Sequence, residues 1–225
     1  MTGVLYLIAT PIGNLGDITL RSIEVLRAVD FIICEDTRRS GMLLKHFGIK
    51  KPLRSYHDHT PKEREEALVR ELKDGMQAAY LTDAGTPLIS DPGFGLVRAA
   101  VEVGVRIEAI PGPSAFVNAL VLSGLPTHAF TFAGYLPQKQ KGRQDSLRAL
   151  ANEPRTLIFY ESPHRLLKTL EDMLHILGDR KASVSREMTK KFEETARGTI
   201  LEILEHFRKG KILGEFVIVV AGKQD

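Results

Sequence analysis

The 225-residue sequence has few cysteines, no long apolar run and no large excess of one charge, and each of these features excludes a class of protein. Cys34 is the single cysteine, which excludes an internal disulfide and suits a reducing compartment. No apolar run approaches the roughly 20 residues that cross a bilayer. The first such run, VLYLIA, lacks the basic flank of a signal peptide. We therefore expect a soluble, cytoplasmic protein without a membrane partner.

The charge balance limits how the chain can bind an anion. Its formal net charge is only +3, and it has no block of like charges of the kind found in basic tails. A nucleic-acid partner is permitted, but a single chain has little general affinity for RNA. With 43% hydrophobic residues, the chain can bury a core of its own.

Nucleotide-binding fingerprints are also missing. No G-x-x-x-x-G-K-[ST] occurs, and the nearest approach to G-x-G-x-x-G, which begins at Gly93 and Gly95, has Arg98 where the third glycine is needed. The segment LTDAGTPLISDPGFG, residues 81–95, is nevertheless rich in glycine and proline. It therefore predicts an irregular loop in which the backbone can approach a ligand closely.

Apolar runs of strand length alternate with helical patterns, which predicts an α/β chain. The expected strands are residues 4–9, 31–34, 77–81, 105–110, 130–134, 156–161, 182–187, 192–199 and 215–222. The expected helices are residues 20–29, 40–47, 61–72, 95–103, 114–123, 163–177 and 200–209. The stiff turn PGPSA predicts a boundary near residue 113, which gives domains 1–113 and 114–225. Consecutive strands in the second half predict a mixed sheet there, and a cleft between the domains is the default ligand site.

Two helix starts carry capping signals. Thr60 can cap the helix at residues 61–72, with Glu63 completing a capping box and Gly75 marking the end. Ser162 can cap the helix that follows it, where Glu161 can pair with Arg165.

Three loops of one kind follow apolar strands, at residues 10–19, 83–93 and 111–114. In open α/β sheets, ligands bind beyond the carboxyl ends of strands, so these loops can line one pocket. They offer backbone amides and the hydroxyls of Thr86 and Ser114, with few cations. This chemistry suits an adenosine-type ligand better than a triphosphate. A purely structural turn remains the alternative for the first loop.

Two further groups of polar and charged residues lie close to the ends of predicted strands. CEDTRRS supplies carboxylates and arginines at a helix start, where surface ion pairing is the alternative to ligand contact. SYHDHT holds His57 and His59 but no third ligand with zinc spacing, so we expect no metal.

Six segments taken in order resemble one known family. They are IATPIGNLGDITLRSIEVL, CEDTRRSGMLLKHFGI, LTDAGTPLISDPG, PGPSAFVNALVLSGLPTHAFTFAGYLP, FYESPHRLLKTLEDM and REMTKKFEETARGT. Together they resemble the tetrapyrrole methylase superfamily, and within it the branch that methylates a cytidine 2′-hydroxyl of bacterial small-subunit ribosomal RNA. The resemblance runs from about Leu5 to Val220 and therefore covers nearly the whole chain.

The resemblance implies two α/β domains of the tetrapyrrole methylase type, with S-adenosylmethionine held in the cleft between them. The implied donor-binding residues are Pro11, Ile12, Asp83, Thr86, Ile89, Ser114, Ala115, Tyr160 and Met188. The implied substrate is a cytidine ribose in the decoding region of 16S ribosomal RNA, within an assembled small ribosomal subunit. A homodimer is also implied.

The resemblance favours substrate contacts by Arg38 and Arg39, and we expect further substrate contacts from His59, His164, Arg165 and Lys190. Methyl transfer from a sulfonium needs alignment more than a potent nucleophile, and a general base within reach of the hydroxyl would assist it. Candidates for that base, or for orienting the ribose, are Glu35, Asp36, His57, Asp83 and Glu161, and the sequence does not choose among them. The alternatives are a methyltransferase acting on a corrin-type tetrapyrrole and a non-catalytic RNA-binding module.

Overall fold

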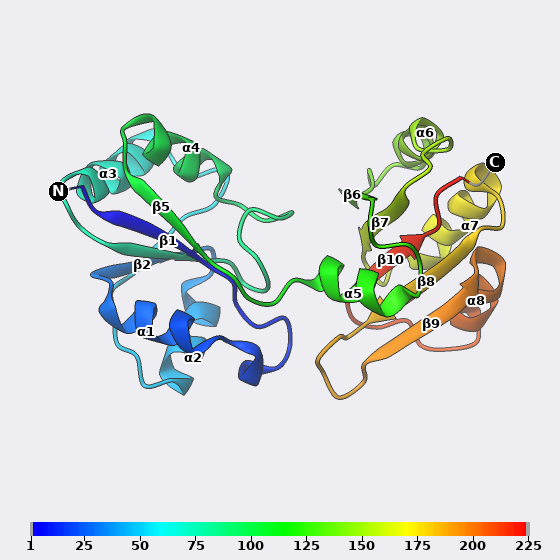
Figure 1. Ribbon diagram of the computed structural model, residues 1–225, viewed down its shortest axis with the longest axis horizontal. Coiled ribbons are helices and arrows are strands. Elements are labelled where there is room, and N and C mark those ends of the chain that lie inside the picture. Colours follow the sequence, from blue (N-terminus) through cyan, green and yellow to red (C-terminus); the bar gives the residue numbers. More distant parts are fainter. Residues whose placement is uncertain (1, 224–225) are drawn as a thin grey trace. The chain divides into compact units, whose positions relative to one another are not determined.

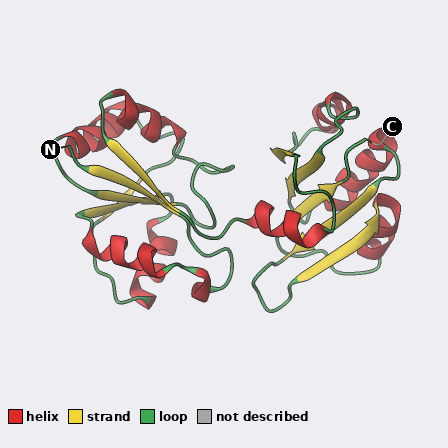
Figure 2. Cartoon of the chain, in the orientation of Figure 1, coloured by secondary structure: helices red, strands yellow, loops and turns green. Residues whose placement is uncertain are grey.

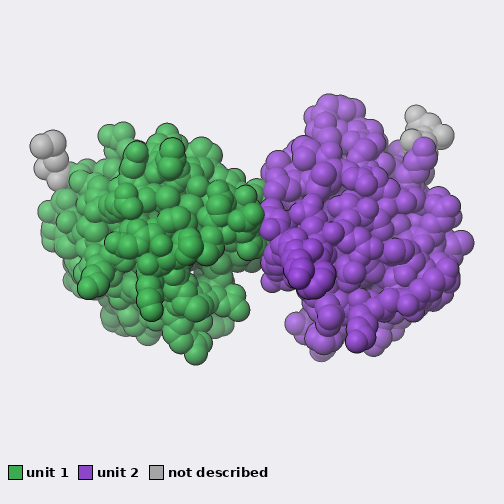
Figure 3. All heavy atoms as spheres, turned by 90° about the horizontal axis from the view of Figure 1, so that it is seen from below, with its two compact units in different colours: residues 1–114 green, residues 115–225 purple. Residues whose placement is uncertain are grey.

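The computed structural model describes residues 2–223 and divides into two compact units. The first unit ends at Ser114 and the second begins at Ala115 (Figure 3). Residues 1 and 224–225, at the outer ends of the predicted domains 1–113 and 114–225, lie outside the described part. The functional roles of the two domains stay predictions.

The first unit is a five-stranded parallel sheet in the order β3-β2-β4-β1-β5 (Figure 1). Its elements are β1 (Val4–Ile8), α1 (Leu20–Ala28), β2 (Phe31–Cys34), α2 (Thr37–His46), β3 (Leu53–Ser55), α3 (Lys62–Lys73), β4 (Ala78–Leu81), α4 (Phe94–Glu102) and β5 (Arg106–Ile110), with a 3₁₀ turn at Leu15–Asp17. All residues of β2 and β4 are buried, as expected for parallel strands covered on both faces.

Helices cover both faces of this sheet (Figure 2). The cores assign α1 and α2 to one face, through Leu26 and Leu44, and α3 and α4 to the other, through Leu72 and Leu96. The loops after β1 and β2 therefore lead to one face, and the loop after β4, the strand between them, leads to the other. Such a divergence opens a crevice at the carboxyl edge of a sheet, where α/β proteins bind ligands.

The second unit is a mixed five-stranded sheet in the order β6-β7-β10-β8-β9, as the consecutive strands predict. Its elements are α5 (Ala115–Ser123), β6 (Phe130–Tyr135), α6 (Gln140–Ala149), β7 (Thr156–Glu161), α7 (Leu166–Leu177), β8 (Lys181–Arg186), β9 (Glu194–Thr199), α8 (Ile200–Arg208) and β10 (Phe216–Val220). Among the described strands of this unit, β6 and β7 are parallel neighbours and the other neighbouring pairs are antiparallel.

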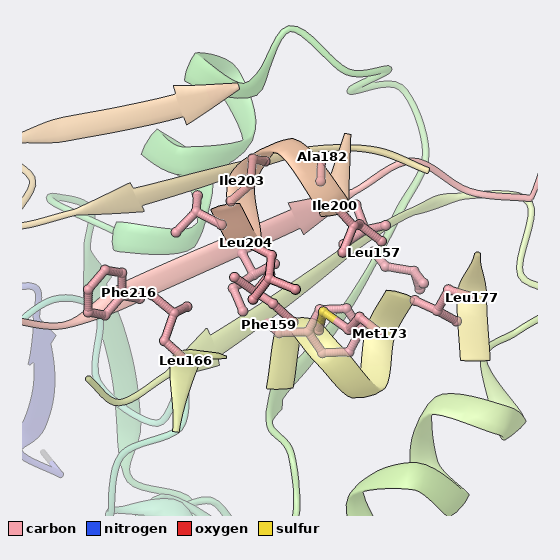
Figure 4. Close-up of a cluster of buried hydrophobic side chains, with 14 of the residues drawn as sticks. Leu157, Phe159, Leu166, Met173, Leu177, Ala182, Ile200, Ile203, Leu204 and Phe216 are labelled. Carbon is pink, nitrogen blue, oxygen red and sulfur yellow. The ribbon is translucent and has the colours of Figure 1, made fainter. Parts of the chain in front are cut away.

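The core of the second unit lies between the sheet and its helices (Figure 4). Phe159 of β7, Met173 of α7 and Ile203 of α8 are all fully or almost fully buried in it. Helix α5 packs against β8 and β10 and is not part of this cluster. Among the helices of residues 2–223, none has the length and apolarity to cross a bilayer.

The structure corrects both predicted helix caps. The hydroxyl of Thr60 accepts the His57 amide at 2.8 Å, and α3 begins after Pro61 without a side-chain cap. Ser162 lies in a turn before α7, where its carbonyl, not its hydroxyl, accepts the Leu166 amide. Each hydroxyl lies one to three residues too early in the chain to reach the first free amides of its helix. The capping box that does form starts α8, at Thr199.

Two elements, β3 and α6, were absent from the predicted set. β3 is only three residues long, and α6 has few apolar residues. Its anchor is instead an ion pair, in which Arg143 Nε lies 2.6 Å from Asp172 Oδ2 of α7 and both side chains are buried. Gln144 donates to the other carboxylate oxygen at 2.8 Å. An apolar periodicity does not reveal a helix that is held in this way.

Breaking this buried pair should therefore be costly. We expect Asp172→Ala to lower the free energy of unfolding in urea by about 3 kcal/mol, because it leaves Arg143 charged and unpaired in the interior. The matched control is Asp145→Ala. It removes an exposed ion pair between Asp145 and Arg148, both on α6, and should lower the free energy of unfolding by at most about 1 kcal/mol. Equal losses for the two variants would contradict this role.

Candidate functional site

Hydrogen bonds join the three predicted ligand loops of the first unit. Thr10 and Gly85 form a β-bridge, with N–O distances of 2.9 and 3.0 Å. The Thr10 hydroxyl donates to the Thr82 carbonyl at 3.1 Å, and the Thr86 hydroxyl donates to the Pro113 carbonyl at 3.2 Å. The loops after β1, β4 and β5 thus form one assembly, as the sequence predicts.

The backbone is strained in two loops. Within the described residues, the non-glycine residues with positive φ are Leu88 at 70°, Ser90 at 62°, Glu187 at 48° and Thr189 at 65°. The first two lie in the loop after β4, and the other two flank Met188 after β8. Each such conformation costs on the order of 1 kcal/mol, and such strain clusters at ligand and active sites. The resemblance assigns residues of both loops to donor binding.

The rear of the β4 loop is fixed by the sheet beneath it. Tyr80 of β4 donates its hydroxyl to the Pro92 carbonyl at 2.7 Å. Gly93 follows with a φ of 121°, and a Cβ there would lie 2.5 Å from Tyr80 Cε1. Only glycine satisfies both constraints, so the SDPG end of the loop is a rigid support for residues 83–89.

A pocket of about 220 Å³ lies among these loops and α2 in the first unit. Its lining residues are Thr10, Pro11, Leu15, Arg39, Ser40, Met42, Leu43, Thr82 and Asp83. Asp83 Oδ2 pairs with Arg39 at 3.0 Å, whereas Asp83 Oδ1 and Thr82 Oγ1 are buried without a hydrogen-bond partner among the described residues. Buried polar atoms are normally satisfied, so this pair marks a place for a polar ligand group.

Two neighbouring carboxylates after β2 differ in their environments. Burial raises the pKa of Glu35, and the charges of Asp83 and Asp58 raise it further. Asp36 instead accepts hydrogen bonds from the backbone and side chain of Arg38, which lower its pKa and cap α2. Glu35 is therefore the stronger base of the two, and the carboxylate of Asp36 is occupied by the hydrogen bonds that cap α2.

The histidine-containing loop after β3 contributes two exposed side chains, His57 and His59. Their loop reaches the same carboxyl edge as Glu35, because β2 and β3 are parallel neighbours. No group of three His, Cys, Asp or Glu side chains able to hold a metal ion occurs within residues 2–223.

The second unit gathers its predicted residues at one edge of its sheet. Phe216 of β10 pairs with Glu161 of β7 on one side and with Arg186 of β8 on the other, so Tyr160 and Met188 both lie near this edge. The Tyr160 ring packs against the rings of Phe132 and Tyr135, at centroid distances of 5.1 and 5.4 Å.

Structural contacts occupy several predicted residues of this unit. The Glu161 side chain is completely buried and accepts from the Thr169 hydroxyl, the Ser162 amide and Arg165. Arg165 also donates to the Leu136 carbonyl. The Glu161–Arg165 pair predicted from sequence is confirmed, and these contacts argue against either residue meeting substrate. Lys190 pairs with Glu187 at 2.8 Å, and His164 is exposed.

Sequence reasoning missed three hydroxyl residues of the first-unit pocket. Thr10 and Thr82 each follow a parallel strand within two residues, and Ser40 lies in the first turn of α2. A hydroxyl within two residues of the end of a parallel strand is the signal that could have found the first two, because it lies at the edge where ligands bind.

The family relationship is now decided by comparison. The model of the family described as Tetrapyrrole (Corrin/Porphyrin) Methylases matches residues 4–204. The chain belongs to this family. Ribosomal RNA small subunit methyltransferase I from Haemophilus influenzae is 50% identical, over 99% of this chain and 80% of that protein. The enzyme of the same name from Thermotoga maritima is 46% identical, over 99% of this chain and 100% of that one.

Solved structures show the same fold. Uroporphyrin-III-C-methyltransferase from Thermus thermophilus aligns with a TM-score of 0.67 at 20% identity, over 97% of this chain and 94% of that one. Diphthine synthase aligns with a TM-score of 0.71 at 16% identity, over 97% and 90%. The resemblance read from the six sequence segments and the tetrapyrrole methylase-type fold are thus both confirmed.

The raised pKa of Glu35 predicts a pH-dependent stability. A carboxyl that binds its proton more tightly in the folded state makes the protein less stable as pH rises from the ordinary glutamate value of 4.5 through the raised folded pKa. Glu35→Gln removes this effect. It should raise the Tm relative to the wild type at neutral pH, with the difference shrinking below pH 4.5.

Asp36→Ala is the adjacent control, with the opposite sign. The lowered pKa of Asp36 contributes stability above its unfolded pKa that is lost as pH falls, so this variant should lower the Tm at neutral pH. Thermal melts of both variants over a pH series provide the measurement. A Glu35→Gln variant that is less stable than the wild type at neutral pH would contradict the assigned environment.

Proposed function

We propose that this protein transfers a methyl group from S-adenosylmethionine to the ribose 2′-hydroxyl of a cytidine in the decoding region of 16S ribosomal RNA. One backbone observation carries the proposal. Within residues 2–223, the non-glycine residues with a positive φ all lie in two loops that are predicted to bind the donor. The curated relatives support the substrate, because chains 46–50% identical to this one are named ribosomal RNA small subunit methyltransferases.

The residues present fit the proposed methyl donor. The donor carries an ammonium group, a sulfonium and an adenosine, so it needs an acceptor, apolar surface and backbone amides. In the first unit, the unsatisfied Asp83 Oδ1 supplies the acceptor, and Pro11, Ile12, Thr86 and Ile89 lie in the joined loops. Ser114 continues the third loop. From the second unit, we propose that Ala115, Tyr160 and Met188 complete the same site.

The main task of the protein in this reaction is positioning. When bound, S-adenosylmethionine supplies a methyl group that is already activated by its positively charged sulfur. The bridged loops restrict where a ligand can lie, and the buried Thr82, with the buried Oδ1 atom of the partly exposed Asp83, excludes water from one side. Alignment of the reacting atoms and exclusion of water can lower the activation free energy of such a displacement by roughly several kcal/mol.

We propose Glu35 as the group that accepts the hydroxyl proton. Its raised pKa makes it a stronger base than an ordinary glutamate, and it lies at the carboxyl edge beside Asp83. His57, on the adjacent loop, and Asp83 itself are the remaining candidates. Asp36 is engaged as a helix cap and Glu161 is fully bonded, so neither enters this mechanism.

The exposed basic side chains supply substrate contacts. Arg38 is 90% exposed, and Arg39 is anchored by Asp83 with its side chain still 66% exposed, so both can reach RNA phosphates. His59 and His164 are exposed as well. Lys190 remains a weaker proposal because it pairs with Glu187, and the contacts of Arg165 are structural.

Methylation of a corrin-type macrocycle is the second candidate. The family description favours it, but the uroporphyrin enzyme is only 20% identical, whereas the ribosomal relatives reach 50%. A macrocycle also needs a broad apolar trough, and Arg39 borders the pocket of the first unit. A non-catalytic RNA-binding module would not need strained ligand loops. The homodimer, the assembled subunit as substrate and the cytoplasmic location stay predictions.

The direct test combines the protein with labelled S-adenosylmethionine and small ribosomal subunits lacking the modification. We expect label in the RNA and a reverse-transcription stop at one cytidine of the decoding region, at limiting nucleotide concentration. Naked 16S ribosomal RNA should be a poorer substrate, because the net charge of +3 gives little general affinity. Label on a base, on a protein or on no RNA would refute the proposed reaction.

A substitution tests the donor loop separately. Thr86→Arg should abolish S-adenosylmethionine binding in calorimetry, because a long charged side chain would fill the space between the β4 and β5 loops. Thr86→Val removes only the hydrogen bond to Pro113 and should weaken binding less. Thr127→Arg, at an exposed site in the second unit, is the control and should bind like the wild type. Unchanged binding by a folded Thr86→Arg variant would remove this loop from the donor site.

A further inference from the structure

A second hollow of the first unit lies along the outer side of α2, away from the joined loops. It has a volume of about 710 Å³ and lies between the second half of α2, the loop at residues 47–52 and the start of the edge strand β3. Its lining residues are Gly41, Leu44, Lys45, Gly48, Ile49, Lys50, Lys51, Pro52 and Leu53, and we call it the α2 groove.

The charge of the α2 groove has one sign. Three of its lining residues are lysines and none is acidic. Lys51 is engaged in the fold, since its Nζ donates to the Val29 carbonyl at 2.6 Å. Lys45 and Lys50 are exposed and form no ion pair within residues 2–223. An apolar floor with unpaired cations at its rim fits a polyanion that also has an uncharged face.

Gly41 is the second observation. It lies in the interior of α2, where glycine is less stable than alanine. The fold does not require it, because a Cβ at this position would be 3.8 Å from Leu53 Cδ1, an ordinary contact distance. Because Gly41 has no side chain, nothing projects from α2 into the groove at this position. Such a surface lets a ligand approach the backbone closely.

Helix α2 also connects the groove with the proposed substrate side chains. Its Arg39, Met42 and Leu43 line the pocket beside Asp83, whereas Gly41, Leu44 and Lys45 line the groove. A strand that crosses this helix can therefore reach both. The helix is ten residues, or roughly 15 Å, long, which limits the distance between the two contacts.

We propose that the α2 groove holds the sugar-phosphate backbone of the RNA that flanks the target nucleotide. Lys45 and Lys50 contact phosphates, and the ribose face packs over Gly41. This contact positions substrate and takes no part in methyl transfer. It rests on the proposed function for the identity of the RNA.

The first test is the salt dependence of binding to small ribosomal subunits, measured by filter retention. For Lys45→Gln/Lys50→Gln, the slope of log K against log salt should fall in magnitude by roughly 1.4, because each phosphate contact on a single strand contributes about 0.7. The KM for subunits should rise while kcat and donor affinity stay close to the wild-type values. The control, Lys62→Gln/Lys73→Gln on α3, changes the net charge equally at exposed sites on the opposite face of the sheet.

Gly41→Ala separates an RNA role from a structural one. This variant should have a higher Tm than the wild type yet bind subunits more weakly, because the added methyl group raises the floor of the groove. A higher Tm with unchanged binding, together with a lysine variant that matches its control, would overturn the proposal. If the wild type binds subunits but methylates no ribose, the proposed function fails, and the two binding measurements still decide the role of the groove.

Discussion

The two hydrogen bonds between Thr10 and Gly85 are the constraint on which the first-unit site depends. They join the loops that leave β1 and β4, two neighbouring strands whose following helices lie on opposite faces of the sheet. Without such a link, the divergence of the chain would leave two independent loops. With it, the crevice has fixed walls, and Thr86 can extend the assembly to the loop after β5.

The rigidity of this assembly also explains how strain is retained. Leu88 and Ser90 adopt a conformation that leucine and serine rarely occupy, between the bridge at Gly85 and the support at Pro92. A free loop would relax, whereas a loop fixed at both ends keeps its backbone in the shape that a ligand requires. Partial burial of Glu35 is a similar case, because a carboxylate with a raised pKa reduces stability, and such groups cluster at functional sites.

Much of the fold could be predicted from the sequence, because parallel strands covered on both faces produce continuous apolar runs such as FIIC. Helix α6 could not, since a buried Arg143–Asp172 pair across 29 residues replaces the apolar periodicity. The capping signals failed at Thr60 and Ser162, where the hydroxyl or carbonyl closed a local turn instead. Sequence alone located the three loops that the structure joins by hydrogen bonds, and the resemblance supplied Tyr160 and Met188 as proposed donor contacts. Neither could show that the Glu161 carboxylate accepts hydrogen bonds from within the fold, or that Asp83 Oδ1 has no hydrogen-bond partner among the described residues. Both facts depend on contacts between distant segments.

Hydrogen exchange with and without S-adenosylmethionine tests the central claim most directly. If the bridged and strained loops hold the donor, its addition should slow exchange of the backbone amides in residues 12–14, 84–86, 88–90 and 187–191. Amides of α3, which contributes no residue to the joined loops or to the pocket beside Asp83, should be unchanged and serve as the internal reference. Protection confined to other segments, or equal in α3 and the loops, would contradict the assignment of these loops to the methyl donor.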